Sequence, residues 1–274
     1  MLPSTPPVAL GPRALISATG PDALRFLNGQ LTNDIGKVGP KQSLPAAALN
    51  AKGGLDAVCC VHHLPEGYLI DAPMDLREGL LARLDRYLIA DEVTLSDETG
   101  TFSLAHIPGE KRPLLTGPLS LPACARFGLP GFDVLAIQDP PLGDLEVLSP
   151  DEWEHRRIEL GIPDWGKELA PGLLPAEAGL DEYMVSFDKG CYLGQEVVSR
   201  MKRAGKTNKH LVKLTVPEGT VTPALFFHEG KEAGEITSVS PLGGIALGFR
   251  KRRAEDVGEF SAQEDGGGAT IRVR

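Results

Sequence analysis

The residue types best suited to chemistry are concentrated in one short run of the sequence, Phe187–Glu196. It reads F-D-K-G-C-Y-L-G-Q-E, so an amine, a thiol, a phenol, an amide and a carboxylate stand close to two glycines. Neither a core strand nor a solvated helix has this composition. Glycines let a backbone turn sharply or approach a ligand closely, and a lysine stabilises a neighbouring thiolate when both face one partly exposed pocket. The run is therefore typical of a ligand site.

A second group of metal-ligating residue types, Cys59, Cys60, His62 and His63, has a different interpretation. On a strand, Cys59 and His63 face one way while Cys60 and His62 face the other. Neither face then offers more than two ligands, whereas sites for a metal such as zinc use three or four converging ligands. We interpret these residues as the buried end of a strand and predict no metal site.

The elements that must position these groups are predicted first in the N-terminal half. A helix is expected to begin with Thr19 as its cap and Asp22 at its third position, and to end near Asn28. Two apolar runs separated by a glycine turn predict a hairpin, and apolar residues at helical spacing predict an amphipathic helix. The expected ranges are 46–49 and 57–61 for the hairpin, 76–88 for the helix, and 92–95 and 132–137 for two further strands.

In the C-terminal half, Ser149-Pro150-Asp151-Glu152 combines a capping serine, a proline at the first helical position and a glutamate at the third. This pattern predicts a helix over 150–160 that stops at Gly161. Beyond residue 206 the pattern changes to short apolar pieces at regular intervals, which is typical of a small antiparallel barrel. The expected strands are 211–216, 224–227, 234–238, 244–248 and 269–273.

Composition limits the classes of function. The chain has 274 residues, of which 42% are hydrophobic and 24% charged, and its net charge is −9. This acidity argues against general attraction to nucleic acid or to anionic membranes. The sequence contains no uncharged apolar run of membrane-spanning length, and its four cysteines show no CxxC spacing, so we expect a cytoplasmic protein with reduced thiols.

Three motifs in order resemble those of one family. Lys189–Glu196 resembles the K-G-C-[YF]-x-G-Q-E signature of the folate-binding YgfZ family in the glycine-cleavage T-protein superfamily, an eight-position match. Residues 26–34 (FLNGQLTND) and 174–181 (LPAEAGLD) resemble two further segments of that family. The resemblance implies an α+β fold: a T-protein-like ring of two N-terminal α+β lobes and a small C-terminal antiparallel β-barrel. We expect the lobes in residues 1–203 and the barrel in residues 204–274.

The resemblance also implies a folate site. A pterin presents two adjacent N–H donors that one carboxylate can accept together, and Glu159 in the Arg157-Ile158-Glu159 segment matches the T-protein glutamate in that role. The anionic glutamate tail needs Lys or Arg, and basic residues follow the signature. The expected folate contacts are Glu159, Tyr192, Gln195, Glu196, Arg200 and Arg203, with further basic residues at Lys202, Lys206 and Lys209 and in the run 250–253.

The function implied is that of an accessory protein that binds tetrahydrofolate or another reduced folate. It would support the assembly or repair of iron–sulfur enzymes and thereby tRNA modification, with Cys191 and Lys189 as the working, catalytic residues and iron–sulfur proteins as partners. Direct nucleic-acid binding is not expected.

The alternative is an aminomethyltransferase that passes a one-carbon unit to tetrahydrofolate, and whether the chain is an enzyme stays open at this point. Against it, Asp56 stands one position early in the Gly53-Gly54-Leu55-Asp56 segment compared with the aspartate of T-proteins. On a strand, a one-residue slip reverses the face of a side chain.

Overall fold

The computed structural model describes residues 6–205 and 207–274, which form two compact units. The first unit runs to Leu148 and includes Asp181–Val197, and the second consists of Ser149–Leu180 with Val198–Arg274. None of the helices in the described residues is long and apolar enough to span a bilayer.

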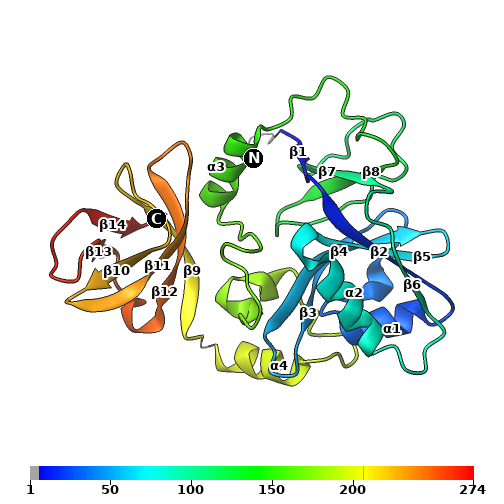
Figure 1. The fold of residues 1–274 in the computed structure, drawn as a ribbon, viewed down its shortest axis with the longest axis horizontal. Coiled ribbons are helices and arrows are strands. Elements are labelled where there is room, and N and C mark those ends of the chain that lie inside the picture. The colour runs from blue at the N-terminus through cyan, green and yellow to red at the C-terminus, as the bar shows by residue number, and fades with distance from the viewer. Residues whose placement is uncertain (1–5, 206) are drawn as a thin grey trace. The chain divides into compact units, whose positions relative to one another are not determined.

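The first unit is built on a five-stranded antiparallel sheet with the strand order β3-β4-β5-β2-β6 (Figure 1). The predicted hairpin is confirmed as β3 and β4, which pair antiparallel across the Asn50–Gly54 turn. The predicted strand 92–95 lies two residues further along the chain. The strands are β2 (Arg13–Thr19), β3 (Leu44–Leu49), β4 (Leu55–Leu64), β5 (Gly67–Pro73) and β6 (Thr94–Asp97).

Two helices accompany this sheet. The amphipathic helix is confirmed as α2 (Arg77–Arg86), and α1 spans Ala23–Gln30. The predicted cap of α1 at Thr19 is wrong, because Thr19 is the last residue of β2 and pairs with Gly67 on one side and Thr94 on the other. Its backbone therefore belongs to the sheet, and the helix begins only after the turn that follows.

A three-stranded sheet with the order β1-β7-β8 completes the first unit. The buried side chains of Leu15 and Leu69 from the larger sheet pack with Leu104 and Leu135 from the smaller one. The two sheets therefore share a hydrophobic core, and burial of this apolar surface stabilises them together. The strands are β1 (Val8–Ala9), β7 (Ser103–Pro108) and β8 (Gly131–Ala136), which confirms the strand predicted at 132–137.

The second unit contains α3 (Pro150–Leu160) and a closed six-stranded barrel with the order β10-β11-β12-β9-β14-β13. The predicted capping box is confirmed: Ser149 accepts from the Glu152 amide while the Glu152 carboxylate accepts from Ser149, and Gly161 ends the helix in the left-handed region. The barrel strands are β9 (Lys209–Thr215), β10 (Ala224–His228), β11 (Lys231–Val239), β12 (Ile245–Lys251), β13 (Glu259–Ser261) and β14 (Thr270–Val273).

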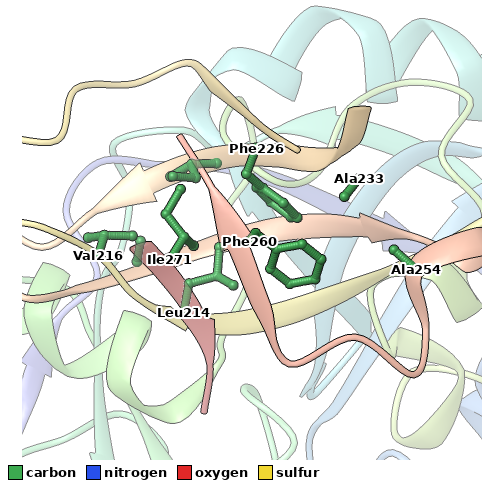
Figure 2. Close-up of a cluster of buried hydrophobic side chains, with 9 residues drawn as sticks. Leu214, Val216, Phe226, Ala233, Ala254, Phe260 and Ile271 are labelled. Carbon is green, nitrogen blue, oxygen red and sulfur yellow. The ribbon is translucent and has the colours of Figure 1, made fainter. Parts of the chain in front are cut away.

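The predicted antiparallel barrel is thus confirmed, and its interior is shown in Figure 2. Phe226 and Phe260 meet with their ring centroids 4.8 Å apart, and Leu214 and Ile271 lie in the same buried cluster. The strand β13 was not predicted, because it has only three residues and places one apolar side chain, Phe260, in the core.

The two units divide the chain at points other than the predicted boundary after residue 203, which lies inside helix α4 (Gln195–Ala204). The segment from α3 to Leu180 belongs with the barrel because buried polar contacts tie it there. Arg157 donates to Ser238 at 2.7 Å, and Glu168 accepts from Thr237 at 2.9 Å and from the Ser238 hydroxyl. Arg157, Glu168 and Ser238 are buried, and their hydrogen bonds join the segment to the barrel.

Candidate functional site

The signature Lys189–Glu196 forms a loop that leads into α4. Gln195 is the first residue of that helix; its amide donates to the Tyr192 carbonyl at 3.2 Å, and its side-chain oxygen accepts from the Tyr192 amide at 3.3 Å. Gly194 adopts the left-handed region at φ +85°, which favours glycine. The loop therefore closes in a tight turn, and Glu196 lies exposed in the first turn of α4.

Lys189 anchors the start of this loop. Its ammonium donates three hydrogen bonds to backbone carbonyls, at 2.7 Å to Asn28, 2.8 Å to Leu31 and 2.6 Å to Asn33. Carbonyls at the end of a helix have no hydrogen-bond partner within it. Because α1 ends at Gln30, the Lys189 ammonium supplies donors to carbonyls at this end. Burial lowers the pKa of Lys189 to about 8, against the opposing effect of the Asp34 carboxylate.

Further contacts bring a second family-like motif against the signature. The Leu193 amide donates to the Gly29 carbonyl at 3.2 Å, and the Ser186 amide donates to the Thr32 carbonyl at 3.0 Å. The Thr32 hydroxyl in turn donates to the Met184 carbonyl at 2.6 Å. The segment 26–34 and the signature loop, far apart in the sequence, therefore form one surface in the first unit.

The β3–β4 turn supports the loop from another side. A Cβ atom on Gly194 would lie 2.6 Å from the Asn50 carbonyl oxygen and 3.3 Å from the Gly53 Cα. A Cβ on Gly53, at φ +76°, would lie 2.7 Å from the Val197 Cβ. Backbone approaches of this kind are open only to glycine. Both glycines are therefore required by packing.

We expect Gly194→Ala to lower the free energy of unfolding by about 2 kcal/mol or more, because the new Cβ meets a backbone carbonyl and the left-handed φ is strained. Urea unfolding of the purified variant measures the change. Gly190→Ala is the matched control, since a Cβ there meets nothing within 4 Å. Equal losses in the two variants would show that the loop does not pack as described.

The thiol of Cys191 is displayed on this supported loop. Cys191 is exposed, whereas Cys59, Cys60 and Cys124 are buried, and all four are free. Burial raises the pKa of Cys59 and of Cys124, so these thiols are held in the neutral, unreactive form. Cys191 is therefore the one of the four cysteines whose side chain is open to solvent.

Tyr192 points the other way, into the protein. It is 7% exposed, and the Lys189 nitrogen lies 5.2 Å from the centre of its ring. Burial raises its pKa to about 12, so the phenol stays protonated at physiological pH. Within the described part of the chain the hydroxyl has no hydrogen-bond partner. Tyr192 packs beneath the loop and supports the Lys189 anchor.

The expected pterin ligand, Glu159, lies in the second unit on α3. Its carboxylate forms an ion pair with Arg156, and its side chain is 39% exposed. The hydrogen bond from Arg156 lowers the pKa of Glu159, so the group is ionised at neutral pH. Its neighbour Arg157 is buried and bonded to Glu154 and Glu168, which fixes this part of the helix.

The basic residues after the signature lie on α4 and beyond it. Arg200 and Arg203 are exposed, and the Arg203 guanidinium donates to the Ser199 carbonyl at 3.3 Å. Lys206 lies outside the described residues. The expected site residues therefore divide between the units: the signature to Glu196 belongs to the first, and Glu159, Arg200 and Arg203 belong to the second.

Asp56 lies at an irregularity that the sequence did not reveal. Ala48 pairs with Ala57 but Leu49 pairs with Leu55, so Asp56 is the extra residue of a β-bulge. Strict alternation of faces does not hold across a bulge. The Asp56 carboxylate accepts from the Arg83 Nε at 3.2 Å, and Arg83 also donates to the Leu49 carbonyl at 2.8 Å.

A buried charge cluster in the first unit was also not predicted from the sequence. Arg126, 5% exposed, donates to both carboxylate oxygens of Asp71 and of Asp133, whose side chains are fully buried. Burial alone would raise the pKa of Asp71, but Arg126 and Arg13 outweigh it and hold that pKa well below the ordinary value. Arg126 thus joins β5 of one sheet to β8 of the other.

Cysteine and histidine side chains that could ligate a metal lie around this cluster. Ligand atoms of Cys60, Cys124 and Asp133 lie within 4.8 Å of one another. The Asp133 carboxylate is already bonded through both oxygens to Arg126, which leaves it poorly suited to a cation. His62 is fully buried. Its Nε2 lies 2.6 Å from an Asp71 carboxylate oxygen and its Nδ1 lies 2.9 Å from the Ser43 hydroxyl, so both ring nitrogens are hydrogen-bonded within the core.

Known proteins resemble the chain in structure and in sequence. No protein-family model matches the chain. By structure, the chain is similar to the glycine cleavage system aminomethyltransferase T from Bartonella henselae, with a TM-score of 0.76 and 19% identity. The match covers 98% of this chain and 84% of the other. It confirms the predicted α+β, T-protein-like fold class.

Curated relatives carry two kinds of name. The chain is 26% identical to the tRNA-modifying protein YgfZ of Sodalis glossinidius over 74% of this chain and 69% of the relative. It is 29% identical to the protein of that name from Escherichia coli O157:H7 over the same shares. It is 31% identical to the mitochondrial iron–sulfur cluster assembly factor IBA57 of Mus musculus, over 87% of this chain and 72% of the relative. The chain therefore belongs to the YgfZ/IBA57 family.

Proposed function

We propose that this protein is a reduced-folate-binding accessory factor that supports the assembly or repair of iron–sulfur enzymes and, through them, tRNA modification. The observation that carries the proposal is the exposed Cys191 thiol on a loop held by Lys189, Gly194 and the segment 26–34. Thiolates are the ligands that iron–sulfur clusters use. The names of the relatives, a tRNA-modifying protein and an iron–sulfur cluster assembly factor, agree with it.

In this proposal Cys191 is the reacting group, acting in the cytoplasm on iron–sulfur client proteins. Lys189, expected from the sequence to work beside it, has its three donors on backbone carbonyls, and we assign it to positioning the loop. Gln195 and Tyr192 hold the turn, and the exposed Glu196 is available to a ligand or client.

The folate is assigned to the residues of the second unit. Glu159 is ionised and partly open to solvent, so it can accept the paired N–H groups of a pterin once Arg156 shifts aside. Arg200 and Arg203 are exposed cations that suit the carboxylates of the glutamate tail. Tetrahydrofolate, or another reduced folate, would then be the resident ligand.

We expect Cys191→Ala to abolish support of iron–sulfur enzymes. The measurement is the activity of an iron–sulfur-dependent tRNA-modifying enzyme in cells that lack this protein, complemented with parent or variant. Asp188→Ala is the control, because Asp188 is an exposed neighbour in the same loop and should complement fully. Full activity with Cys191→Ala would remove the thiol from the mechanism.

The folate assignment is tested separately by calorimetric titration with tetrahydrofolate. We expect the parent to bind, Glu159→Gln to weaken binding by about tenfold or more through loss of a charge-assisted hydrogen bond, and Cys191→Ala to bind as the parent does. Asp151→Asn, on the exposed first turn of the same helix, controls for lost charge. Absence of binding to any reduced folate would contradict the proposal.

The alternative, an aminomethyltransferase, has weaker support. The similarity to the Bartonella protein is one of fold, at 19% identity. Asp56, the residue nearest to the aspartate of T-proteins, is paired with Arg83 at a bulge. Release of a one-carbon unit from an aminomethyl donor onto tetrahydrofolate by the purified protein would favour it over the accessory role.

A further inference from the structure

Two buried thiols of the first unit lie close together, although they come from distant parts of the chain. Cys60 belongs to β4, and Cys124 lies in the segment that leads into β8 (Figure 1). Their sulfur atoms and a carboxylate oxygen of Asp133 all lie within 4.8 Å of one another. Cys60 is 2% exposed and Cys124 is 1% exposed, and both are free thiols. The pair therefore spans the junction between the five-stranded and the three-stranded sheet.

Backbone hydrogen bonds fix the position of Cys124. Its amide donates to the Gly131 carbonyl at 2.8 Å, which ties it to β8. On the other side, the Ala123 amide donates to the Lys41 carbonyl at 2.9 Å, and the Ser43 amide donates to the Ala123 carbonyl at 2.9 Å. Residues 41–43 lead directly into β3, the neighbour of β4. The segment is thus bonded on both sides, and the backbone sets the closeness of the two thiols.

The third group of this cluster, Asp133, has its oxygens in use. One oxygen accepts from the Arg126 Nε at 3.0 Å and lies 2.7 Å from the His106 Nδ1. The other accepts from the Arg126 guanidinium at 2.8 Å. With the carboxylate occupied and a fixed positive charge beside it, what remains is a pair of thiols. The chemistry open to two neighbouring thiols is formation of a disulfide.

The adjacent Cys59 does not compete for Cys124. Successive residues of a strand point to opposite faces, so Cys59 and Cys60 cannot both reach the same partner. A disulfide places its sulfurs about 2.0 Å apart. Because the backbone already holds the sulfurs of Cys60 and Cys124 within 4.8 Å, rotation of the side chains about χ1 is the movement that bond formation requires.

Burial controls when this pair reacts. Burial and, after it, the neighbouring Cys60 thiol raise the pKa of Cys124 well above its ordinary value. The thiolate is the nucleophile in thiol oxidation, so the closed protein keeps the pair reduced. Local opening of a folded structure exposes such groups briefly. The exposed Cys191 therefore meets an oxidant first, and the buried pair follows more slowly.

We propose that Cys60 and Cys124 form an intramolecular disulfide on exposure to a peroxide, and that this bond locks the two sheets of the first unit together. One sulfur attacks a peroxide oxygen, which breaks the O–O bond and yields a sulfenic acid and water. The other sulfur then attacks the first, and the S–O bond breaks as a second water leaves. The two sulfurs are oxidised, the peroxide is reduced, and both thiol protons end in water.

The lock has a consequence for the signature loop. A cross-link between distant parts of a chain restricts the unfolded state and so stabilises the folded one. The loop 189–196 belongs to the same unit, so the bond preserves its support while peroxide is present. The inference depends on neither the folate nor the iron–sulfur role proposed above.

Peptide mapping of the oxidised protein tests the bond. The Cys191→Ser chain is treated with hydrogen peroxide, unfolded and alkylated with N-ethylmaleimide, and its peptides are analysed by mass spectrometry. Replacing Cys191 prevents links between two copies of the chain through the exposed thiol. We expect one pair of peptides joined through Cys60 and Cys124, released by dithiothreitol, with Cys59 alkylated. Absence of this link, or a link through Cys59, overturns the proposal.

Urea unfolding of the same chain tests the lock. The oxidised form should unfold at a higher urea concentration than the form kept in dithiothreitol. Adding Cys59→Ala should keep this shift, since it removes an equally buried thiol of the same strand, and adding Cys124→Ala should abolish it. The comparison of oxidised with reduced chain decides the matter even if Cys124→Ala does not fold. An unchanged or lower midpoint in a chain that carries the bond, or a shift that persists without Cys124, overturns the lock.

Discussion

Replacing Arg126 with methionine is expected to lower the free energy of unfolding of the first unit by about 3–5 kcal/mol, the cost of leaving buried charges without their partner. Arg126 is 5% exposed and bonds both Asp71 and Asp133, which are fully buried. Methionine fills similar space but supplies no charge. Urea unfolding, followed by a signal from the first unit, measures the loss.

The pH dependence of the Arg126→Met variant provides an independent readout. In the parent, Arg126 holds the pKa of both aspartates below the ordinary value, so their contribution to stability is constant above pH 5. In the variant, burial without the guanidinium raises these pKa values. The folded variant then takes up protons as pH falls, and its deficit relative to the parent should shrink between pH 8 and pH 5.

Arg13→Met is the matched control for this prediction. Arg13 bonds the same Asp71 carboxylate at 2.8 Å but its side chain is 18% exposed, so water replaces much of the lost contact. We expect about 1 kcal/mol, well below the loss for Arg126→Met. Equal losses, or an Arg126→Met deficit that does not change with pH, would contradict the role assigned to the buried cluster.

Lys189→Met is expected to release the signature loop, with a local loss of about 2–3 kcal/mol, because three backbone carbonyls lose their donor in a partly buried place. Opening of the loop exposes the amides of Leu193 and Ser186, which donate to Gly29 and Thr32. Hydrogen exchange at these two amides should accelerate by about 30- to 150-fold. Support of iron–sulfur enzymes should fall with it.

A lysine in the neighbouring β3–β4 turn provides the control. Lys52 is exposed, so Lys52→Met should change stability by less than about 0.5 kcal/mol and leave exchange at Leu193 unchanged. If Lys189→Met leaves the two amides as protected as in the parent, the lysine is not the anchor of the loop.

The parent should also show a rise in stability at alkaline pH that Lys189→Met lacks. Burial lowers the pKa of Lys189 to about 8, below its ordinary value of 10.5, so the folded chain releases this proton before the unfolded chain does. The free energy of unfolding contributed by Lys189 therefore rises between pH 8 and pH 10.5. Denaturation series at pH 7.5 and pH 10 measure the difference.

Elements with strong local signals were predicted well. The capping box at Ser149 and Glu152 satisfies the first amides of α3 from within four residues, and the apolar spacing of α2 follows from one helical face. The helix cap predicted at Thr19 was wrong. Threonine is a common capping residue, but the Thr19 backbone pairs with Gly67 and Thr94, which lie far along the chain. Pairing of distant strands overrides a local preference.

Residue types at fixed spacing were enough to predict the family signature, the four-residue helix start at Ser149, the barrel and Cys191 as the thiol of interest. They were not enough to predict that Lys189 bonds carbonyls near residue 30, that Gly194 packs on the Asn50 turn, or that Arg126 joins two sheets. These contacts join residues between 7 and 161 positions apart, and such partners are selected by the packing of whole elements rather than by any local pattern.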